Sequence, residues 1–172
     1  EFIRMNATGC SYMLVNEREK TACRVDMNMT GLYNVQNSLC AIAMVTALGF
    51  DMTECAKALS DLDGVDGRMN VIYRGDFTVI TDYAHTDDAL IKVLSTLKPL
   101  TKGRLICVFG AAGDRDKEKR PMMAKAAEDN ADILVITSDN PAHENPDEII
   151  REVMTGISGK KPCRCITDRR DS

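Results

Sequence analysis

The sequence has no strong excess of charge, no long apolar run and only two histidines. Its 172 residues carry a formal net charge of -4, so no basic surface is predicted for nucleic acid or for an anionic membrane. No apolar run approaches the roughly 20 residues that cross a bilayer, and the start, Glu1-Phe2-Ile3-Arg4, lacks the basic head and apolar stretch of a signal peptide. The histidines are too far apart for a zinc site. We expect no nucleic acid, membrane or metal ion to bind these residues.

Cysteine is present but gives no disulfide framework. The seven cysteines are an odd number at irregular spacing, which favours a reducing, cytoplasmic setting where they act as small hydrophobic residues. Cys163 and Cys165 could be half of a metal site, but without a second Cys or His pair they are more typical of one strand. The composition, 44% apolar and 28% charged, fits one domain, or one domain and part of another.

The first part of the chain changes from strand patterns to helix patterns. Residues 2–29 alternate apolar and polar positions between turn signals, which predicts short antiparallel strands without an evident sheet of their own. Residues 35–48 have helical periodicity that ends at Gly49. A second short helix is predicted at about 53–59, with Asp51 as its N-cap.

From Val71 onward, strand and helix patterns alternate. Strands are expected near 71–74, 77–81, 104–109, 133–137 and 163–166, and helices near 87–97, 118–129 and 146–155. This alternation predicts an α/β fold with a parallel, doubly wound sheet and right-handed crossovers. Glycines among aspartates at 64–68 indicate a linker, where we place a domain boundary between 1–65 and 66–172. Both ends stop inside a pattern, so we expect a fragment of a longer protein.

Polar stretches follow three of the predicted strands, at the point where each strand ends. They are 81–86 (TDYAHT), 113–116 (GDRD) and 138–141 (SDNP). In an open parallel sheet, ligands bind beyond the carboxyl ends of the strands. The three stretches together therefore predict a binding site at one edge of the sheet.

Each stretch also has a simpler interpretation. Asp82 could bind a ribose diol and His85 a phosphate or a proton, or Asp82 could only cap the next helix. Arg115, after small residues whose amides can approach an anion, could bind a carboxylate or phosphate, or belong to a solvated turn. Asp139 could bind an ammonium group and Asn140 a carboxylate, as the ends of an amino acid require, or the stretch could form an Asx-turn.

Upstream positions could also contribute. Asn34 and Asn37, at i and i+3 near the start of the first helix, could read a purine edge together, or serve as an N-cap and a polar face. Arg68 lies near the predicted boundary, where it could contact a ligand or form only a salt bridge.

Taken in order, these stretches resemble the ATP-dependent Mur ligases of peptidoglycan synthesis, above all the branch that adds the third amino acid of the peptide. The motifs are 31–37 (GLYNVQN), 64–69 (GVDGRM), 82–86 (DYAHT), 109–116 (FGAAGDRD) and 139–141 (DNP), within a resemblance that covers about residues 31–156. The resemblance implies that 1–65 end a central ATPase domain and that 66–172 form most of a Rossmann-like C-terminal domain, a mostly parallel sheet flanked by helices.

The resemblance also implies a reaction. ATP would phosphorylate the carboxylate of a UDP-MurNAc-dipeptide, and the amine of an amino acid would displace the phosphate. The implied roles are adenine contact for Asn34 and Asn37, ribose contact for Arg68 and Asp82, a catalytic place near the phosphates for His85, and amino-acid binding for Arg115, Asp139 and Asn140. The enzyme would be a monomer. The P-loop and the main Mg²⁺ ligands belong to parts absent from this chain, so the chain alone is expected to be inactive.

The residue at position 142 distinguishes between two possible amino-acid substrates. Family members that add meso-diaminopimelate typically read Asp-Asn-Pro-Arg, where the arginine pairs with the distal carboxylate, whereas Ala142 stands at that position here. L-lysine has no second carboxylate, so the sequence favours L-lysine. The alternatives are a diaminopimelate-adding enzyme, another Mur or folylpolyglutamate-type ligase, and a non-catalytic nucleotide-binding module.

Overall fold

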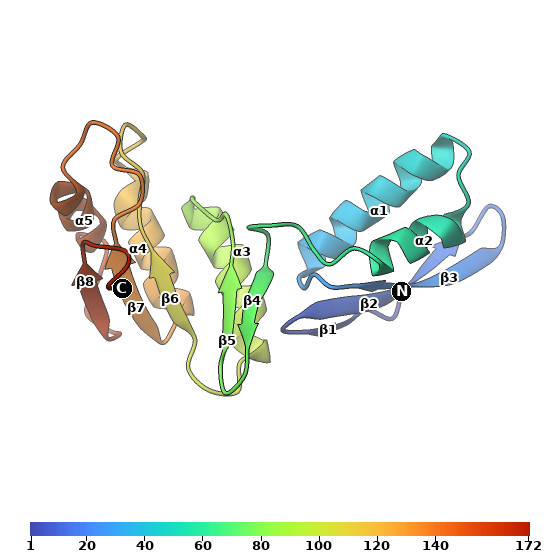
Figure 1. Cartoon of the computed structure of the whole chain (residues 1–172), viewed down its shortest axis with the longest axis horizontal. Helices are drawn as coiled ribbons and strands as arrows, with labels where there is room; N and C mark the ends of the chain where they lie inside the picture. Colours follow the sequence, from blue (N-terminus) through green and yellow to red (C-terminus); the bar gives the residue numbers. More distant parts are fainter. The chain divides into compact units, whose positions relative to one another are not determined.

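The computed structural model describes every residue from Glu1 to Ser172, in two compact units (Figure 1). The first unit contains residues 1–83 and the second contains residues 84–172. Each unit has its own cluster of buried apolar side chains. None of the helices combines the length with the apolar character that a bilayer crossing requires.

An antiparallel sheet opens the first unit. Its strands pair in chain order: β1 (Arg4–Asn6), β2 (Gly9–Asn16) and β3 (Thr21–Met27). Tyr12 and Val25 are register partners on the buried face of the sheet, and they share one core with Ile42 of the first helix. The antiparallel strands predicted for residues 2–29 are confirmed. Contrary to the expectation, they form a three-stranded sheet of their own, and side chains of two helices share its buried core.

These two helices are α1 (Leu32–Ala47) and α2 (Met52–Ser60). Helix α1 begins three residues earlier than its periodicity predicted, and Gly49, which follows its end, has φ 96°. The predicted cap of α2 is confirmed: the Asp51 carboxylate accepts hydrogen bonds from the amides of Thr53 and Glu54, at 2.8 and 3.1 Å. Caps of this kind satisfy amides that have no partner within the helix.

A hairpin follows in the first unit. The strands predicted near 71–74 and 77–81 are present as β4 (Asn70–Arg74) and β5 (Thr78–Thr81), but they pair with each other antiparallel. The prediction that they belong to a parallel sheet is wrong. Residues 75–77 are too few to make the crossover that parallel strands need. β5 is therefore not a strand of the β6–β8 sheet.

The second unit is an α/β domain. Its parallel sheet has the order β6 (Ile106–Phe109), β7 (Ile133–Thr137) and β8 (Cys163–Ile166). Its helices are α3 (Asp87–Leu97), the short 3-10 helix η1 (Lys98–Leu100), α4 (Lys119–Asn130) and α5 (Pro146–Met154). All three predicted helices and the three predicted parallel strands are present, within a few residues of their expected ends. The mixed α/β fold is confirmed.

The helices of the second unit lie on one face of its sheet. Cys107, Phe109 and Leu134 are buried in one core with side chains of α3, α4 and α5, whereas Ile106 and Val108 on the other face of β6 are half exposed. The strand order advances in one direction, and right-handed crossovers that do so put their helices on the same side. The expected double winding needs a reversal of strand order, which these residues do not contain.

A buried carboxylate holds the loop before β8. Glu128 of α4 is 3% exposed and accepts hydrogen bonds from the hydroxyl and amide of Ser158 and from the amide of Lys160, at 2.7 to 3.0 Å. These bonds, led by that of the Ser158 hydroxyl, lower the pKa of Glu128 to about 2. The ionised carboxylate therefore stabilises the fold fully at pH values above about 4.3, the pKa of a glutamate in the unfolded chain.

We expect Glu128→Gln to lower the melting temperature at pH 7 and to have a diminishing effect as the pH falls from about 4 toward 2. The pKa of Glu128 is lower in the folded protein than in the unfolded one, so acidification removes the stabilisation that the wild-type carboxylate provides. Once that carboxyl is protonated, it is uncharged like the glutamine that replaces it. Melting curves of both proteins between pH 7 and pH 2.5 measure this. A difference in melting temperature that stays constant over that range would contradict the assigned role.

Candidate functional site

Two loops meet at the carboxyl end of the parallel sheet. Loop A, residues 110–118, follows β6, and loop B, residues 138–145, follows β7. The amide of Gly113 donates to the carbonyl oxygen of Asn140 at 2.8 Å. A Cβ at Gly113 would lie 1.8 Å from the carbonyl oxygen of Pro141. The loops therefore pack backbone against backbone, at an approach that only glycine permits.

The side chains predicted to bind an amino acid lie on these loops. Arg115 of loop A and Asp139, Asn140 and Ala142 of loop B are all exposed. The Asn140 side-chain oxygen accepts from the Ala142 amide at 3.1 Å, so the predicted Asx-turn is present. This turn uses the side-chain oxygen of Asn140, so a carboxylate ligand would be bound by the Nδ2 group of Asn140. The structure brings both loops to one edge, and their binding roles stay a prediction.

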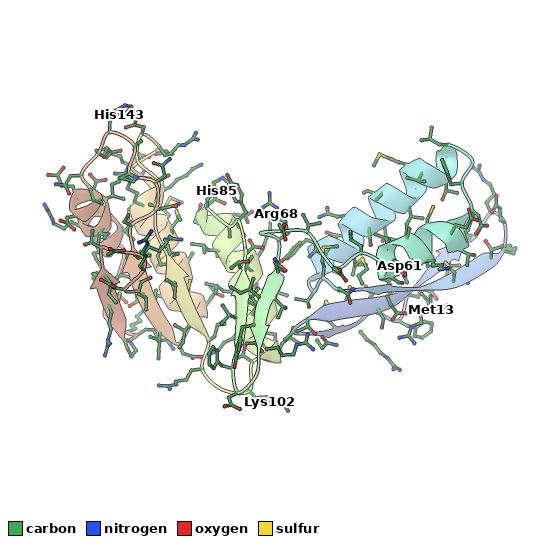
Figure 2. All side chains as sticks on the ribbon, viewed as in Figure 1. Met13, Asp61, Arg68, His85, Lys102 and His143 are labelled. Carbon is green, nitrogen blue, oxygen red and sulfur yellow. The ribbon has the colours of Figure 1, made fainter.

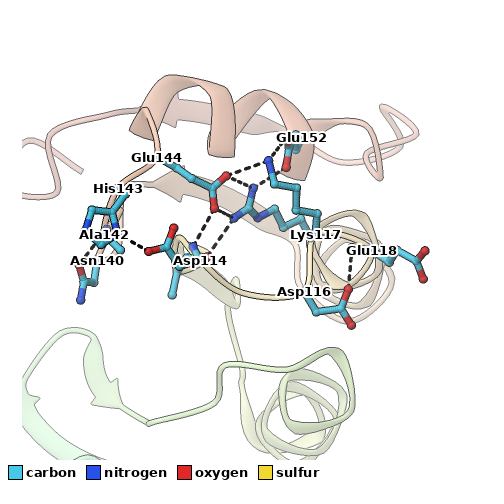
Figure 3. Close-up of polar contacts among 11 residues, drawn as sticks. Asp114, Asp116, Lys117, Glu118, Asn140, Ala142, His143, Glu144 and Glu152 are labelled. Atoms are coloured by element: carbon cyan, nitrogen blue, oxygen red, sulfur yellow. Dashed lines mark hydrogen bonds and ion pairs between the residues drawn. The ribbon is translucent and has the colours of Figure 1, made fainter.

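A buried arginine joins the loops, and sequence reasoning missed it. The Arg120 side chain is 2% exposed and forks onto Glu144, with Nη1 at 2.9 Å and Nη2 at 2.8 Å from its two oxygens (Figure 3). It also pairs with Glu152 of α5, and Lys117 lies 3.0 Å from Glu144. The charged residues around Arg120 are typical of a solvated turn. The one signal that could have indicated a buried side chain is helical spacing, since Arg120 shares a helix face with the buried Met123, three residues later.

Ion pairing sets the charge states of this cluster. The hydrogen bond from Arg120 holds the pKa of Glu144 well below its usual range, with help from the Asp114 amide and Lys117. Arg120 lowers the pKa of Glu152 as well. In return, the bond to Glu144 raises the pKa of the guanidinium. The cluster is therefore fully charged at neutral pH.

A histidine pairs with an aspartate where the loops face each other. His143 Nδ1 lies 2.5 Å from an Asp114 carboxylate oxygen, and this hydrogen bond raises the pKa of His143. The imidazole is otherwise 93% exposed, at the outer end of loop B (Figure 2). Asp114 and Ala142 both have left-handed backbones, with φ 55° and 48°. The contact is one more link between the loops.

Two of the residues predicted to bind ATP lie around the hairpin of the first unit. The Asp82 carboxylate accepts a hydrogen bond from the Met69 amide at 2.8 Å. Arg68 is exposed, with its guanidinium carbon 5.0 Å from the centre of the Tyr83 ring. The helix-cap interpretation of Asp82 is wrong, since Thr86 caps α3.

The other predicted ATP-binding residues differ in their exposure. Asn34 is buried and its Nδ2 donates to the Thr30 carbonyl oxygen at 2.8 Å, whereas Asn37 is exposed. The two asparagines, expected to share a face, thus lie in different surroundings. His85, in the second unit, is exposed beside the start of α3 (Figure 2).

No group of three or more His, Cys, Asp or Glu side chains is arranged to hold a metal ion. The exposed loop residues Arg115, Asp139 and Asn140 carry a guanidinium, a carboxylate and an amide.

A parallel α/β domain with two polar loops at the carboxyl ends of its strands is typical of α/β proteins whose ligands bind beyond those ends. The family model described as "Mur ligase, glutamate ligase domain" matches residues 67–172. The chain belongs to the Mur ligase family.

The relatives sharpen this assignment. The chain is 46% identical over 143 residues to the UDP-N-acetylmuramoyl-L-alanyl-D-glutamate–2,6-diaminopimelate ligase of Aquifex aeolicus. The aligned residues are 83% of this chain and 30% of the relative. It is 41% identical to the ligase of the same name from Geobacillus kaustophilus, over 93% of the chain and 32% of the relative. The chain thus spans about a third of the length of these relatives.

Solved structures agree on the fold. A structure titled as the same 2,6-diaminopimelate ligase is 37% identical and has a TM-score of 0.64, over 98% of this chain and 34% of that one. The Mycobacterium tuberculosis folylpolyglutamate synthase complexed with ADP reaches a TM-score of 0.75 at 19% identity, over 98% of this chain and 37% of its own. The second likeness shows the fold alone.

Proposed function

We propose that the chain is part of an ATP-dependent amide ligase of peptidoglycan synthesis, of the MurE type, which adds the third amino acid to UDP-MurNAc-L-Ala-D-Glu. Residues 1–65 would end its central ATPase domain and residues 66–172 would belong to its C-terminal domain. One observation carries this proposal: loops A and B meet at one sheet edge through the Gly113 contact, in a chain 46% identical to such a ligase. The enzyme would act as a cytoplasmic monomer.

The chemistry needs an activated carboxylate. A carboxylate is a poor electrophile, so transfer of the γ-phosphoryl group of ATP to it gives an acyl phosphate and ADP. The amine of the amino acid then attacks the carbonyl carbon, phosphate leaves, and the amine loses a proton. Asn34, Asn37, Arg68 and Asp82 would bind the nucleotide, with His85 near its phosphates. Mg²⁺ would be held by parts of the longer protein outside these residues.

The amino-acid site would use both loops of the second unit. Arg115 and the Nδ2 of Asn140 would bind the α-carboxylate, and Asp139 would bind the ammonium group until the amine is deprotonated for attack. These side chains are exposed, so a ligand can reach them from solvent. Closure of the domain over ATP would shield the acyl phosphate from water.

Two candidate amino acids remain, each favoured by an observation. Ala142 has no charge for a distal carboxylate, which favours L-lysine. The similar enzymes of Aquifex aeolicus and Geobacillus kaustophilus are named as 2,6-diaminopimelate ligases, which favours diaminopimelate. Phosphate release by the product of the full reading frame, measured with each amino acid, tests both. Release that needs the UDP-linked dipeptide and L-lysine supports the first proposal, and release that no amino acid stimulates rejects the ligase function.

The variant Ala142→Arg is expected to shift the preference from L-lysine toward meso-diaminopimelate by about 10- to 150-fold in kcat/KM, the equivalent of a charged hydrogen bond of about 1.5–3 kcal/mol. Ala142 already has a Cβ at φ 48°, so arginine adds little backbone strain. Kinetics of the full-length enzyme with both amino acids provide the measurement. Ala142→Met, which adds length without charge, is the control, and an equal shift in both variants would count against the charge argument.

A further inference from the structure

Arg120 is an unusual residue to find at the base of two surface loops. Its side chain is 2% exposed, yet it carries a charge that burial disfavours. The charge is compensated by a fork onto Glu144 and by the pair with Glu152. A fourth hydrogen bond runs from Nη2 to the Ala112 carbonyl oxygen, at 3.2 Å. A well-packed apolar residue could fill such a place with similar stability, so the charge itself needs an explanation.

The charge connects the backbones of loops A and B. The Glu144 oxygen that receives Nη2 of Arg120 also accepts from the Asp114 amide at 2.7 Å (Figure 3). Asp114 directly precedes Arg115, and Glu144 follows Ala142 by two positions. A continuous chain of hydrogen bonds therefore runs from α4 through loop B to the residue beside Arg115. Figure 3 shows the hydrogen bond between Glu144 and Asp114 as a dashed line.

We propose that Arg120 is a positioning residue for the incoming amino acid. Through Glu144 it fixes the separation between Arg115 on loop A and Asp139 with Asn140 on loop B, and so sets the spacing between the groups that hold the two ends of the zwitterion. Arg120 itself touches no substrate. This inference rests on the proposed function, because it assumes that those exposed side chains bind the amino acid.

The kinetic test compares two buried charges on the same helix. Arg120→Met in the full-length enzyme is expected to raise the KM for the amino acid at least tenfold while changing the KM for ATP less than twofold. Glu128→Gln is the matched control, since Glu128 is also buried on α4 but bonds residues 158–160, which belong to neither loop. It should lower the melting temperature and leave both KM values unchanged. Arg120→Lys, which keeps the charge but loses the fork, should recover part of the amino-acid KM.

An equal rise of both KM values in Arg120→Met, or a rise of the amino-acid KM in Glu128→Gln as well, would reduce Arg120 to a structural role and overturn the inference. Hydrogen exchange gives a reading that does not depend on activity. The Asp114 amide should exchange at least tenfold faster in Arg120→Met than in Glu128→Gln, and equal rates would overturn the inference. If the wild type releases no phosphate with any amino acid, the ligase proposal fails, while the exchange rates still decide whether Arg120 holds loop A.

Discussion

Gly113→Ala is expected to destabilise the second unit by about 3 kcal/mol or more. The added Cβ would lie 1.8 Å from the Pro141 carbonyl oxygen and 2.5 Å from its carbon. Both atoms belong to the backbone, so no side-chain rotation relieves the overlap, and loops A and B must separate. Separation breaks the Gly113–Asn140 hydrogen bond and removes the common edge on which the proposed site depends.

Gly103→Ala is the matched control for that variant, because a Cβ at Gly103 meets nothing within 4 Å. Amide exchange in β7, whose Leu134 and Ile136 are fully buried, reports the stability of the second unit. Exchange should be at least a hundredfold faster in Gly113→Ala than in Gly103→Ala, since each 1.4 kcal/mol is a factor of ten. Similar exchange in the two variants would show that the loops do not approach so closely.

Asp139→Asn is expected to lower kcat/KM for the amino acid by about 10- to 150-fold, with little change in the KM for ATP. The substitution keeps the shape of the side chain but removes the negative charge that would pair with the ammonium group, a loss of about 1.5–3 kcal/mol. Steady-state phosphate release by the full-length enzyme measures the loss.

Asp171→Asn is a matched control, since Asp171 is exposed in the same unit and lies in neither loop. It should leave the amino-acid kinetics unchanged. A loss of the same size in both variants, or a loss that appears in the KM for ATP, would remove Asp139 from the amino-acid site.

Local signals in the sequence were enough to find most elements of the fold. The cap at Asp51 fixed the start of α2 because the aspartate acts on amides only two and three residues away. The hairpin of β4 and β5 shows where such signals fail. Strand patterns looked alike in both parts of the chain, and only the short connection at 75–77 separates an antiparallel pair from the parallel sheet.

The candidate site was predictable where it depends on the ends of strands. Arg115 and Asp139 follow β6 and β7, and parallel strands bring such positions to one edge. The contacts that hold the loops were not predictable in the same way. Arg120 pairs with Glu144, 24 positions away, and with Glu152, 32 positions away, and no pattern within a single segment indicates those partners.

A crystal structure of the full-length enzyme with L-lysine and a non-hydrolysable ATP analogue tests the central claim most directly. We predict that the amino acid lies between loops A and B, with its carboxylate within hydrogen-bond distance of Arg115 and its ammonium group within hydrogen-bond distance of Asp139. An amino acid bound elsewhere, with both side chains still facing solvent, would contradict the account.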